Sequence, residues 1–388
     1  MKVISKYFFG FNSKEIGIKI GKEVSGSNPD ILLLFHTEQY SPEEITAGIY
    51  ETLSEKVIIA GGVGGGVINT HNVARFGVSF SAICFEDSNC FVKPELYSEK
   101  ELDFGKGSES GESFEKRADL KLLLSFYSGD SEEVFSDFTR GQASSVSVPV
   151  SGGSLAYSGT MPENLKPNRT LFLNGRFVCN AVLSLGFYGD IQVKTAISSG
   201  WETPYEKPCL ITDTEDCVVK KIGEKTAVSF YEDFFGSSGS QKDFFLFPLS
   251  IKSGAYSKSV LFPQKWNSNT GEIKFSVSPG KNVPVSIAVA SPEQLIENAR
   301  ASFQEVVNSS IKPGFSLMFS SHIRYQILGT LYREEKRALF SQNKNLFSLL
   351  GVTTKGEIFY EKDTGSSETI YHNGTTVCIV CGEKSDEV

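Results

Sequence analysis

The residues best suited to bind a charged group follow a short apolar run near the C-terminal end of the chain. Residues 315–319 predict a buried strand, and the sequence SSHIR follows it at 320–324. Ser320 or Ser321 can cap a helix that begins here, which places Arg324 in its first turn. Unpaired backbone amides at a helix start, together with a guanidinium, form a site for a carboxylate or a phosphate.

The position of Arg324 requires an anionic partner. A basic side chain at the start of a helix costs about 0.3–1 kcal/mol, because it opposes the helix dipole. The partner is either a ligand or an internal carboxylate, for which Glu335 and Glu357 are the candidates. An internal pair would tie the helix to the sheet, and the sequence leaves both possibilities open.

The glycine-rich segment GGVGGG at residues 61–66 invites comparison with nucleotide-binding loops. A dinucleotide fingerprint needs Gly-x-Gly-x-x-Gly, and counting from Gly62 and Gly64 places Val67 at the last position. A P-loop needs Lys and then Ser or Thr after its final glycine, where Val67 and Ile68 stand instead. We interpret the segment as a turn between strands. The alternative is a ligand that approaches the backbone amides closely, which glycine permits.

Cys378 and Cys381 form a single Cys-x-x-Cys pair within the strand-like run 376–380. Residues three apart on a strand point to opposite faces, so we predict that neither cysteine binds a metal. Four histidines, at positions 36, 71, 322 and 372, lie far apart in sequence. No metalloprotease or nucleophile-elbow motif is present, so no metal site and no cofactor are expected.

Three segments of the chain share one order of elements. In each, a buried strand (30–36, 120–127 and 315–319) precedes a helix (from 41, from 131 and over 323–340). A second apolar strand then ends in glycine (57–61, 146–152 and 349–351). Helical crossovers join parallel strands, so each pair of strands is predicted to be parallel. Three units of one type indicate duplication within one architecture.

Other local signals complete a mixed α/β or α+β fold, with sheets flanked by helices in two related halves. Asn174-Gly175 between apolar runs predicts a hairpin, and Ser291-Pro292 predicts the start of a helix. Residues 86–117 and 236–242 are expected to be surface loops. The second of these, which follows a predicted helix at 226–235, marks the predicted boundary between domains 1–235 and 236–388.

The composition excludes several classes of protein. The 388 residues carry a net charge of −8 with no basic run, which disfavours nucleic-acid binding through the phosphate backbone. The longest aliphatic stretch, residues 31–35, is far too short to cross a membrane. Seven scattered cysteines fit reduced thiols, and we therefore expect a cytoplasmic protein.

Several of these segments resemble, in order and spacing, the FIST domain family. The C-terminal half of the family is matched by residues 320–324, 334–335, 351–358 and 372–375, and the N-terminal half by 29–35, 57–66, 152–153 and 171–175. The resemblance covers about residues 12 to 380. It implies a sensory input module, found alone or joined to signalling outputs, that binds small ligands such as amino acids. The chain departs from the family where a cysteine is common, since Ser321 and Ile323 stand before Arg324.

The predicted ligand site lies where the start of the Arg324 helix faces the two later segments of the matching pattern. The helix start, with Arg324 and Ser321, would hold a carboxylate, and Glu357 would hold an ammonium group. The remaining predicted site residues belong to the turn 354–357 and the segment 373–375; they are Thr354, Gly356, Asn373 and Thr375. Together these groups suit a zwitterion.

The function predicted from the sequence is a cytoplasmic, non-enzymatic sensor of a small ligand, with a possible signalling protein as its partner. The first alternative is a hydrolase on the same scaffold that uses Glu357 or His372 as general base. The second is a protein-interaction module that recruits a partner through the surface of a sheet.

Overall fold

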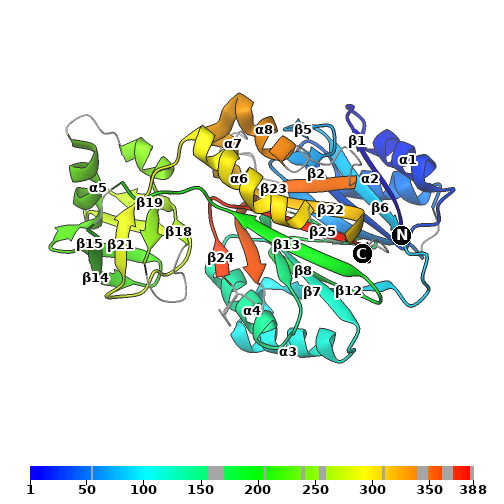
Figure 1. Cartoon of the computed structure of the whole chain (residues 1–388), viewed down its shortest axis with the longest axis horizontal. Coiled ribbons are helices and arrows are strands. Elements are labelled where there is room, and N and C mark those ends of the chain that lie inside the picture. The colour runs from blue at the N-terminus through cyan, green and yellow to red at the C-terminus, as the bar shows by residue number, and fades with distance from the viewer. Residues whose placement is uncertain are drawn as a thin grey trace.

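The computed structural model shows a mixed α/β protein with a large lobe and a small lobe at one end of it (Figure 1). The structure describes residues 1–53, 56–155, 170–204, 207–236, 241–252, 259–307, 311–338, 348–360 and 370–384. The large lobe holds two sheets, and the small lobe holds a third. This is the predicted fold class.

The first sheet of the large lobe has the strand order β1-β6-β2-β3-β10-β11. Helices α1 and α2 pack against each other, and the side chains of Ile20 and Ile49 are buried with Leu34 in the same cluster. Asn12 and Ser41 cap the two helices, because the side chain of each accepts a backbone N–H three residues later. The bounds are β1 (Lys2–Phe8), α1 (Ser13–Val24), β2 (Ile31–Thr37), α2 (Pro42–Tyr50), β3 (Ile58–Gly64), β6 (Val78–Cys84), β10 (Leu171–Leu173) and β11 (Arg176–Val178).

The second sheet follows the path β13-β25-β22-β23-β9-β8-β12-β7; β4 and β24 also pair with β23, and β5 pairs with β4. Helices α3 and α4 pack together on it, while α6 covers β13 and β25. The bounds are β4 (Val67–Asn69), β5 (Val73–Ala74), β7 (Phe91–Ser98), α3 (Phe104–Glu115), β8 (Leu120–Ser128), α4 (Glu132–Ser144), β9 (Val150–Leu155), β12 (Ala181–Tyr188), β13 (Gln192–Ser198), α6 (Pro292–Val307), β22 (Ile311–Ser321), β23 (Ser348–Tyr360), β24 (Ile370–His372) and β25 (Thr376–Lys384).

The three predicted parallel pairs are all present: β2 with β3, β8 with β9, and β22 with β23. A glycine stands at the same place in each unit, opposite Leu34, Ser125 and Met318 on the neighbouring strand. A Cβ at these glycines would lie 1.7, 2.0 and 2.5 Å from the carbonyl oxygens of those three residues, so only glycine fits. The glycines are Gly61, Gly152 and Gly351.

The residue after each of these partners is a phenylalanine, and the three rings form a chain between the two large sheets. The centroids of Phe35 and Phe126 are 5.4 Å apart, and those of Phe126 and Phe319 are 5.5 Å apart. All three side chains are fully buried in one apolar cluster. The repeated units therefore meet in a shared core.

Three local predictions are corrected by the structure. The glycine run at 61–64 lies inside β3 rather than in a turn. The predicted loop 86–117 is wrong, because β7 and α3 form there. Gly107 of α3 would place a Cβ 1.9 Å from the carbonyl oxygen of Phe138, so the glycines serve close helix packing. The predicted helix 323–340 is broken into α7 (His322–Leu328), a 3₁₀ turn (Gly329–Leu331) and α8 (Tyr332–Ala338); residues 339 and 340 lie outside the described ranges.

The break between α7 and α8 has a local cause. Gly329 adopts φ of 51°, a left-handed conformation that ends α7. The hairpin at Asn174-Gly175 is confirmed, with φ of 49° and 77° at its two central residues. The predicted helix start at Ser291 is confirmed as well, because Ser291 and Gln294 exchange side-chain and backbone hydrogen bonds.

The small lobe is an antiparallel sheet of order β18-β17-β21-β14-β15-β20-β19, with β16 beside β15 and α5 packed on it. Its strands come from both sides of residue 235, so the predicted boundary between domains passes through this sheet. The chain leaves and re-enters the large lobe through two linkers that pair by a bridge between Glu202 and Val289. The bounds are β14 (Cys209–Glu215), β15 (Val218–Ile222), β16 (Lys225–Thr226), α5 (Ala227–Phe235), β17 (Leu249–Ile251), β18 (Val260–Leu261), β19 (Pro263–Asn267), β20 (Glu272–Phe275) and β21 (Pro284–Ile287).

Candidate functional site between the lobes

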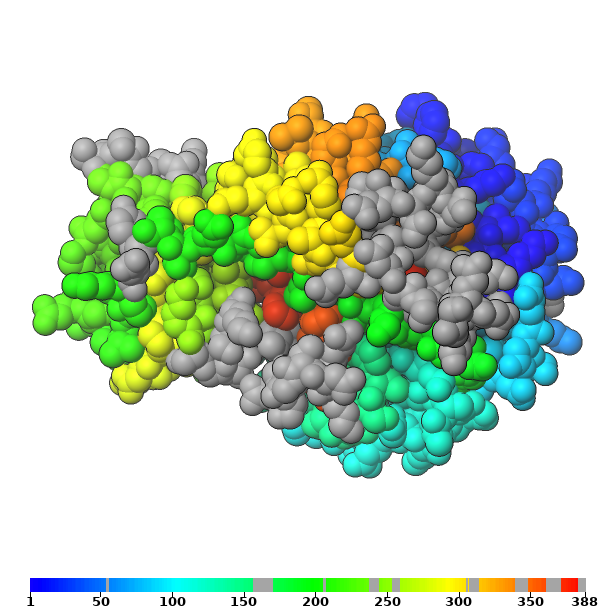
Figure 2. All heavy atoms as spheres, viewed as in Figure 1, coloured from blue at the N-terminus to red at the C-terminus, as the bar shows by residue number. Residues whose placement is uncertain are grey.

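A cleft of about 600 Å³ lies between the two lobes, and we call it the interlobe cleft. One wall comes from β19, β20 and the residues beside them in the small lobe. The other comes from α7, the start of α4 and the middle of β23 in the large lobe. The small lobe, green to yellow, occupies one end of the elongated molecule in Figure 2. Three predicted site residues line the cleft: Ser321, Thr354 and Asn373.

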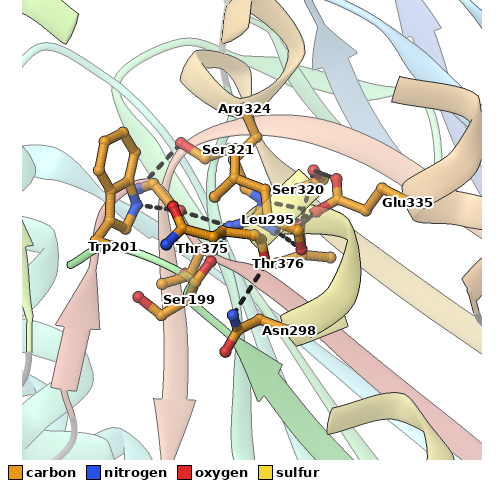
Figure 3. Close-up of polar contacts among 12 residues, drawn as sticks. Ser199, Trp201, Leu295, Asn298, Ser320, Ser321, Arg324, Glu335, Thr375 and Thr376 are labelled. Atoms are coloured by element: carbon orange, nitrogen blue, oxygen red, sulfur yellow. Dashed lines mark hydrogen bonds and ion pairs between the residues drawn. The ribbon is translucent and has the colours of Figure 1, made fainter. Parts of the chain in front are cut away.

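Arg324 lies behind the cleft and is fully buried. Its Nε donates to Glu335 Oε1 at 2.6 Å, and its Nη2 lies 2.5 Å from the same oxygen. Nη1 donates to the carbonyl oxygens of Ser199 and, at 3.1 Å, Gly374; Nη2 donates to that of Leu295 at 3.1 Å. These contacts engage the five N–H donors of a guanidinium. The internal pair that the sequence left open is therefore present, with Glu335 as the partner (Figure 3).

Glu335 is equally well partnered. Ser320 Oγ donates to its Oε2 at 3.2 Å, and Thr376 Oγ1 donates to its Oε1 at 3.1 Å. We call Arg324, Glu335 and these contacts the Arg324 hub. The hub joins α7 and α8 to β22, β25, α6 and the linker that leads into the small lobe.

Neither serine caps α7 as predicted. The side chain of Ser320 faces Glu335, and that of Ser321 accepts from the Gly374 N–H at 3.2 Å. The carbonyl oxygen of Gly374 also accepts from Trp201 Nε1 at 2.8 Å (Figure 3). The segment around Gly374 is thus held by the hub on one side and by the interlobe linker on the other.

Glu357 is fully buried beside the cleft. Thr354 Oγ1 donates to its Oε1 at 2.6 Å, and the backbone N–H and Oγ1 of Thr375 donate to its Oε2 at 3.1 and 2.7 Å. Burial raises the pKa of Glu357 to about 8 despite these hydrogen bonds. Gly356 leaves room for Tyr371, since a Cβ there would lie 2.0 Å from the tyrosine hydroxyl. Glu357, Gly356 and Thr375 therefore support the wall of the cleft from behind, whereas Thr354 also lines it.

Asn373 spans the two lobes. It lines the cleft, and its Nδ2 donates to Ser276 Oγ of the small lobe at 2.9 Å. The side chain is 3% exposed, so this hydrogen bond is shielded from water. Asn373 therefore connects the segment held by the hub to the opposite wall of the cleft.

Glu132, the first residue of α4, belongs to the candidate site and was not predicted from the sequence. It lines the cleft and is only 4% exposed, yet its Oε2 has no hydrogen-bond partner among the described residues. Burial raises the pKa of this carboxyl group. The positive charge of Lys355 and hydrogen bonding by the nearby Tyr371 and Gln264 side chains act in the opposite direction and lower it. The sequence contained a signal for this position. The acidic residues Asp130, Glu132 and Glu133 follow β8 at the point where α4 begins, just as α7 begins where β22 ends.

The cleft also holds basic groups. Lys265 and Lys274 line the wall from the small lobe, and Lys355 lines the wall from β23. His322 lies on the same surface; burial and the nearby Arg75 lower its pKa. The cleft therefore offers both signs of charge to a bound molecule.

The two residues named as general bases do not line this cleft. Glu357 is enclosed by its hydroxyl and amide donors, as described above. His372 is 8% exposed, and burial lowers its pKa to about 3. Its Nδ1 lies 3.4 Å from Ser259 Oγ.

Cys378 and Cys381 point to opposite sides of β25, as strand alternation predicts. Cys378 belongs to the apolar cluster under α6, and Cys381 to the cluster between the two large sheets. Burial raises the pKa of both thiols, which keeps them protonated. Within the described ranges, no group of three or more His, Cys, Asp or Glu side chains is arranged to hold a metal ion. None of the described helices combines the length and apolarity that a membrane span requires.

Comparison with known proteins gives a clear family and distant structural similarities. Phosphoribosylformylglycinamidine synthase II from Thermotoga maritima aligns at 8% identity over 98% of this chain and 72% of that chain, with a TM-score of 0.22. T. maritima PurL complexed with ATP aligns at 10% identity with the same coverages and a TM-score of 0.21. No curated protein matches. Residues 30–225 match the FIST N domain and residues 227–360 match the FIST C domain, so the chain belongs to the FIST family.

Proposed function

We propose that this protein senses a small molecule by binding it in the interlobe cleft without changing it chemically. FIST domains are sensory domains of signal transduction, and both the N and the C domain are matched here. The observation that supports the site is the cleft itself: two lobes provide its walls, and charged groups of both signs line it. The proposed ligand is an amino acid or a small carboxylate, and the proposed compartment is the cytoplasm.

The connections between the lobes favour a sensory role. A ligand that contacts both walls adds interactions across the cleft, where Asn373 already bonds Ser276. The two linkers pair with each other, and the Arg324 hub holds one of them through the carbonyl oxygen of Ser199. Binding then shifts the lobes toward the arrangement in which both walls contact the ligand. A signalling partner would recognise that arrangement.

A ligand screen with a cleft-blocked variant tests this proposal. The chain is heated with each of the twenty amino acids and with small carboxylates, and a ligand at 100 times its Kd should stabilise it by about 2.7 kcal/mol. Gln326 lies on the exposed side of α7 and lines the cleft, so Gln326→Trp should abolish the stabilisation. Lys19→Trp, at an exposed position of α1, is the matched control and should leave it intact.

Chemical analysis of the bound ligand addresses the enzyme alternative. The proposal expects every compound that stabilises the chain to be recovered unchanged after long incubation. A stabilising compound that is hydrolysed by wild type and spared by the cleft-blocked variant would favour the hydrolase instead. Stabilisation that persists in Gln326→Trp would place the ligand elsewhere.

A further inference from the structure

We infer that Glu132 binds a primary ammonium group of the ligand, so that the cleft selects amino acids over carboxylates that lack an amine. The inference rests on the proposed function, because it assumes that the ligand occupies the interlobe cleft. It also decides between the two ligand classes proposed above.

The first observation is an unused acceptor in a buried place. Glu132 is 4% exposed and lines the cleft, and its Oε2 lacks a hydrogen-bond partner in the part of the chain that the structure describes, although the polar side chains of Tyr371 and Gln264 lie close enough to the carboxyl group to lower its pKa. Burying a carboxylate oxygen without a donor is costly, and native proteins rarely keep such a group without a use. A ligand donor would supply the missing bond.

The second observation is the contrast with neighbouring carboxylates. Glu335 and Glu357 are also fully buried, but every oxygen of both accepts hydrogen bonds from the protein. Glu133, the next residue of α4, lies partly exposed outside the cleft and accepts from the Cys217 thiol at 3.1 Å. The missing partner is therefore specific to the carboxylate that faces the cleft.

The helix start alone does not account for Glu132. An acidic side chain in the first turn stabilises a helix, but it does so while exposed to solvent as well. Glu43 and Glu44 in the first turn of α2 provide that interaction from exposed positions. Glu132 has the same position in its helix, but it is buried and lines the cleft. The interaction with the helix dipole requires neither of these.

The other charges in the cleft define the rest of the ligand. Lys265 and Lys274 approach from the small lobe, and Lys355 and Asp130 lie on the large lobe near Glu132. An ammonium bound to Glu132 leaves the small-lobe lysines to attract the carboxylate of the same molecule. Hydroxyl and amide groups of Ser321, Thr354 and Asn373 lie on the same surface and offer neutral hydrogen bonds.

The test compares each amino acid with two derivatives, using the full chain. The N-acetyl derivative removes the ammonium and keeps the carboxylate, whereas the α-amide keeps the ammonium and removes the carboxylate. We expect the amino acid that stabilises wild type most to lose its effect on acetylation and to retain part of it as the amide. Its affinity for Glu132→Gln should fall tenfold or more, because a charge-assisted hydrogen bond is lost.

Glu133→Gln is the matched control, since it makes the same change one residue further along α4 and outside the cleft. Its affinity should equal that of wild type. Glu132→Gln is nearly isosteric and removes a buried charge, so its melting temperature without ligand should equal or exceed that of wild type. A lowered melting temperature with unchanged affinity would show a purely structural role and overturn the inference.

Different results would exclude the ammonium site at Glu132 and the ligand site in the interlobe cleft. If acetylated and free amino acids bind equally well and Gln326→Trp blocks both, the cleft is the ligand site and the assignment of Glu132 is wrong. If no amine-bearing compound stabilises the chain while small carboxylates do, the assignment is again wrong and the proposed function stands. Binding that Gln326→Trp does not affect removes the proposed site and the inference together.

Discussion

Two buried carboxylates in this protein, Glu335 in the Arg324 hub and Glu132 in the interlobe cleft, have opposite surroundings. Glu335 pairs with a guanidinium whose donors are all engaged, and two hydroxyl groups donate to it as well. Glu132 keeps an oxygen without a partner within the described residues, although it is nearly as buried. A buried carboxylate whose oxygens all have partners in the protein contributes to the stability of the fold. One that keeps an oxygen without a partner can gain a hydrogen bond when a ligand binds.

The comparison changes how the basic and acidic residues of the sequence are interpreted. Arg324 is the most conspicuous candidate for binding an anion, but groups of the protein itself accept the hydrogen bonds of its guanidinium. Glu132 was not among the predicted site residues, since the sequence indicated only that a helix begins at 131. The type of a residue therefore indicates which ligands it could bind. Whether it can bind one depends on whether the protein leaves any of its donors or acceptors without a hydrogen bond.

The largest expected effect comes from breaking the hub. Arg324→Met leaves Glu335 buried without its cation, so we expect the free energy of unfolding to fall by about 3–5 kcal/mol. Denaturant unfolding measures the loss. The double variant Arg324→Met/Glu335→Leu should recover much of it, because both buried charges are then gone. A loss below about 1 kcal/mol in the single variant would contradict the structural role of the hub.

Glu357 is intermediate between these two carboxylates: both of its oxygens accept hydrogen bonds, but it forms no ion pair with any of the residues that the structure describes. Its pKa is about 8 in the folded protein, above the usual value near 4.5, so the folded state binds the proton more tightly than the unfolded state. Its contribution to stability is fully present below pH 4.5 and is lost as the pH rises through 8.

This linkage predicts a measurable pH dependence. Between pH 6 and pH 8, wild type should lose about 2 kcal/mol of unfolding free energy that Glu357→Gln does not lose. The neutral amide serves as the comparison because it resembles the protonated acid in shape. Parallel pH profiles of the two proteins would show that Glu357 stays ionised in the folded state.

Asn373 connects the two regions, and its loss should have a smaller effect. Asn373→Ala removes the bond from Nδ2 to Ser276 Oγ, which costs about 1 kcal/mol of unfolding free energy. It should also weaken ligand binding, because the bond joins the two walls of the cleft. Ser276→Ala removes the same bond from the other side, and the double variant should cost little more than either single change. Additive losses would mean that the two residues act separately.

Much of the fold follows from local sequence signals. The caps at Ser41 and Ser291, the turn at Asn174-Gly175 and the three parallel units were predicted because each depends on a few adjacent residues. Helix α3 was missed because Gly107 and Gly111 disfavour a helix by propensity. They are required by contact with α4, more than 25 residues away in sequence, and such a contact has no local signature.

The site was predicted less completely for the same reason. Ser321, Thr354 and Asn373 were found because they lie near one another in the third unit and after it. Glu132 joins them only because β8 and β22 belong to one sheet, and the small-lobe wall joins them only through the two linkers. The partner of Arg324 was foreseen as one of two glutamates, but geometry was needed to choose between them.

The most direct test of the ammonium site at Glu132 is a calorimetric titration of Glu132→Gln with the amino acid that stabilises wild type most. We predict a Kd at least tenfold higher than that of wild type, in a protein whose melting temperature without ligand is equal or higher. An unchanged Kd together with a lower melting temperature would contradict it, because Glu132 would then be a structural group like Glu335.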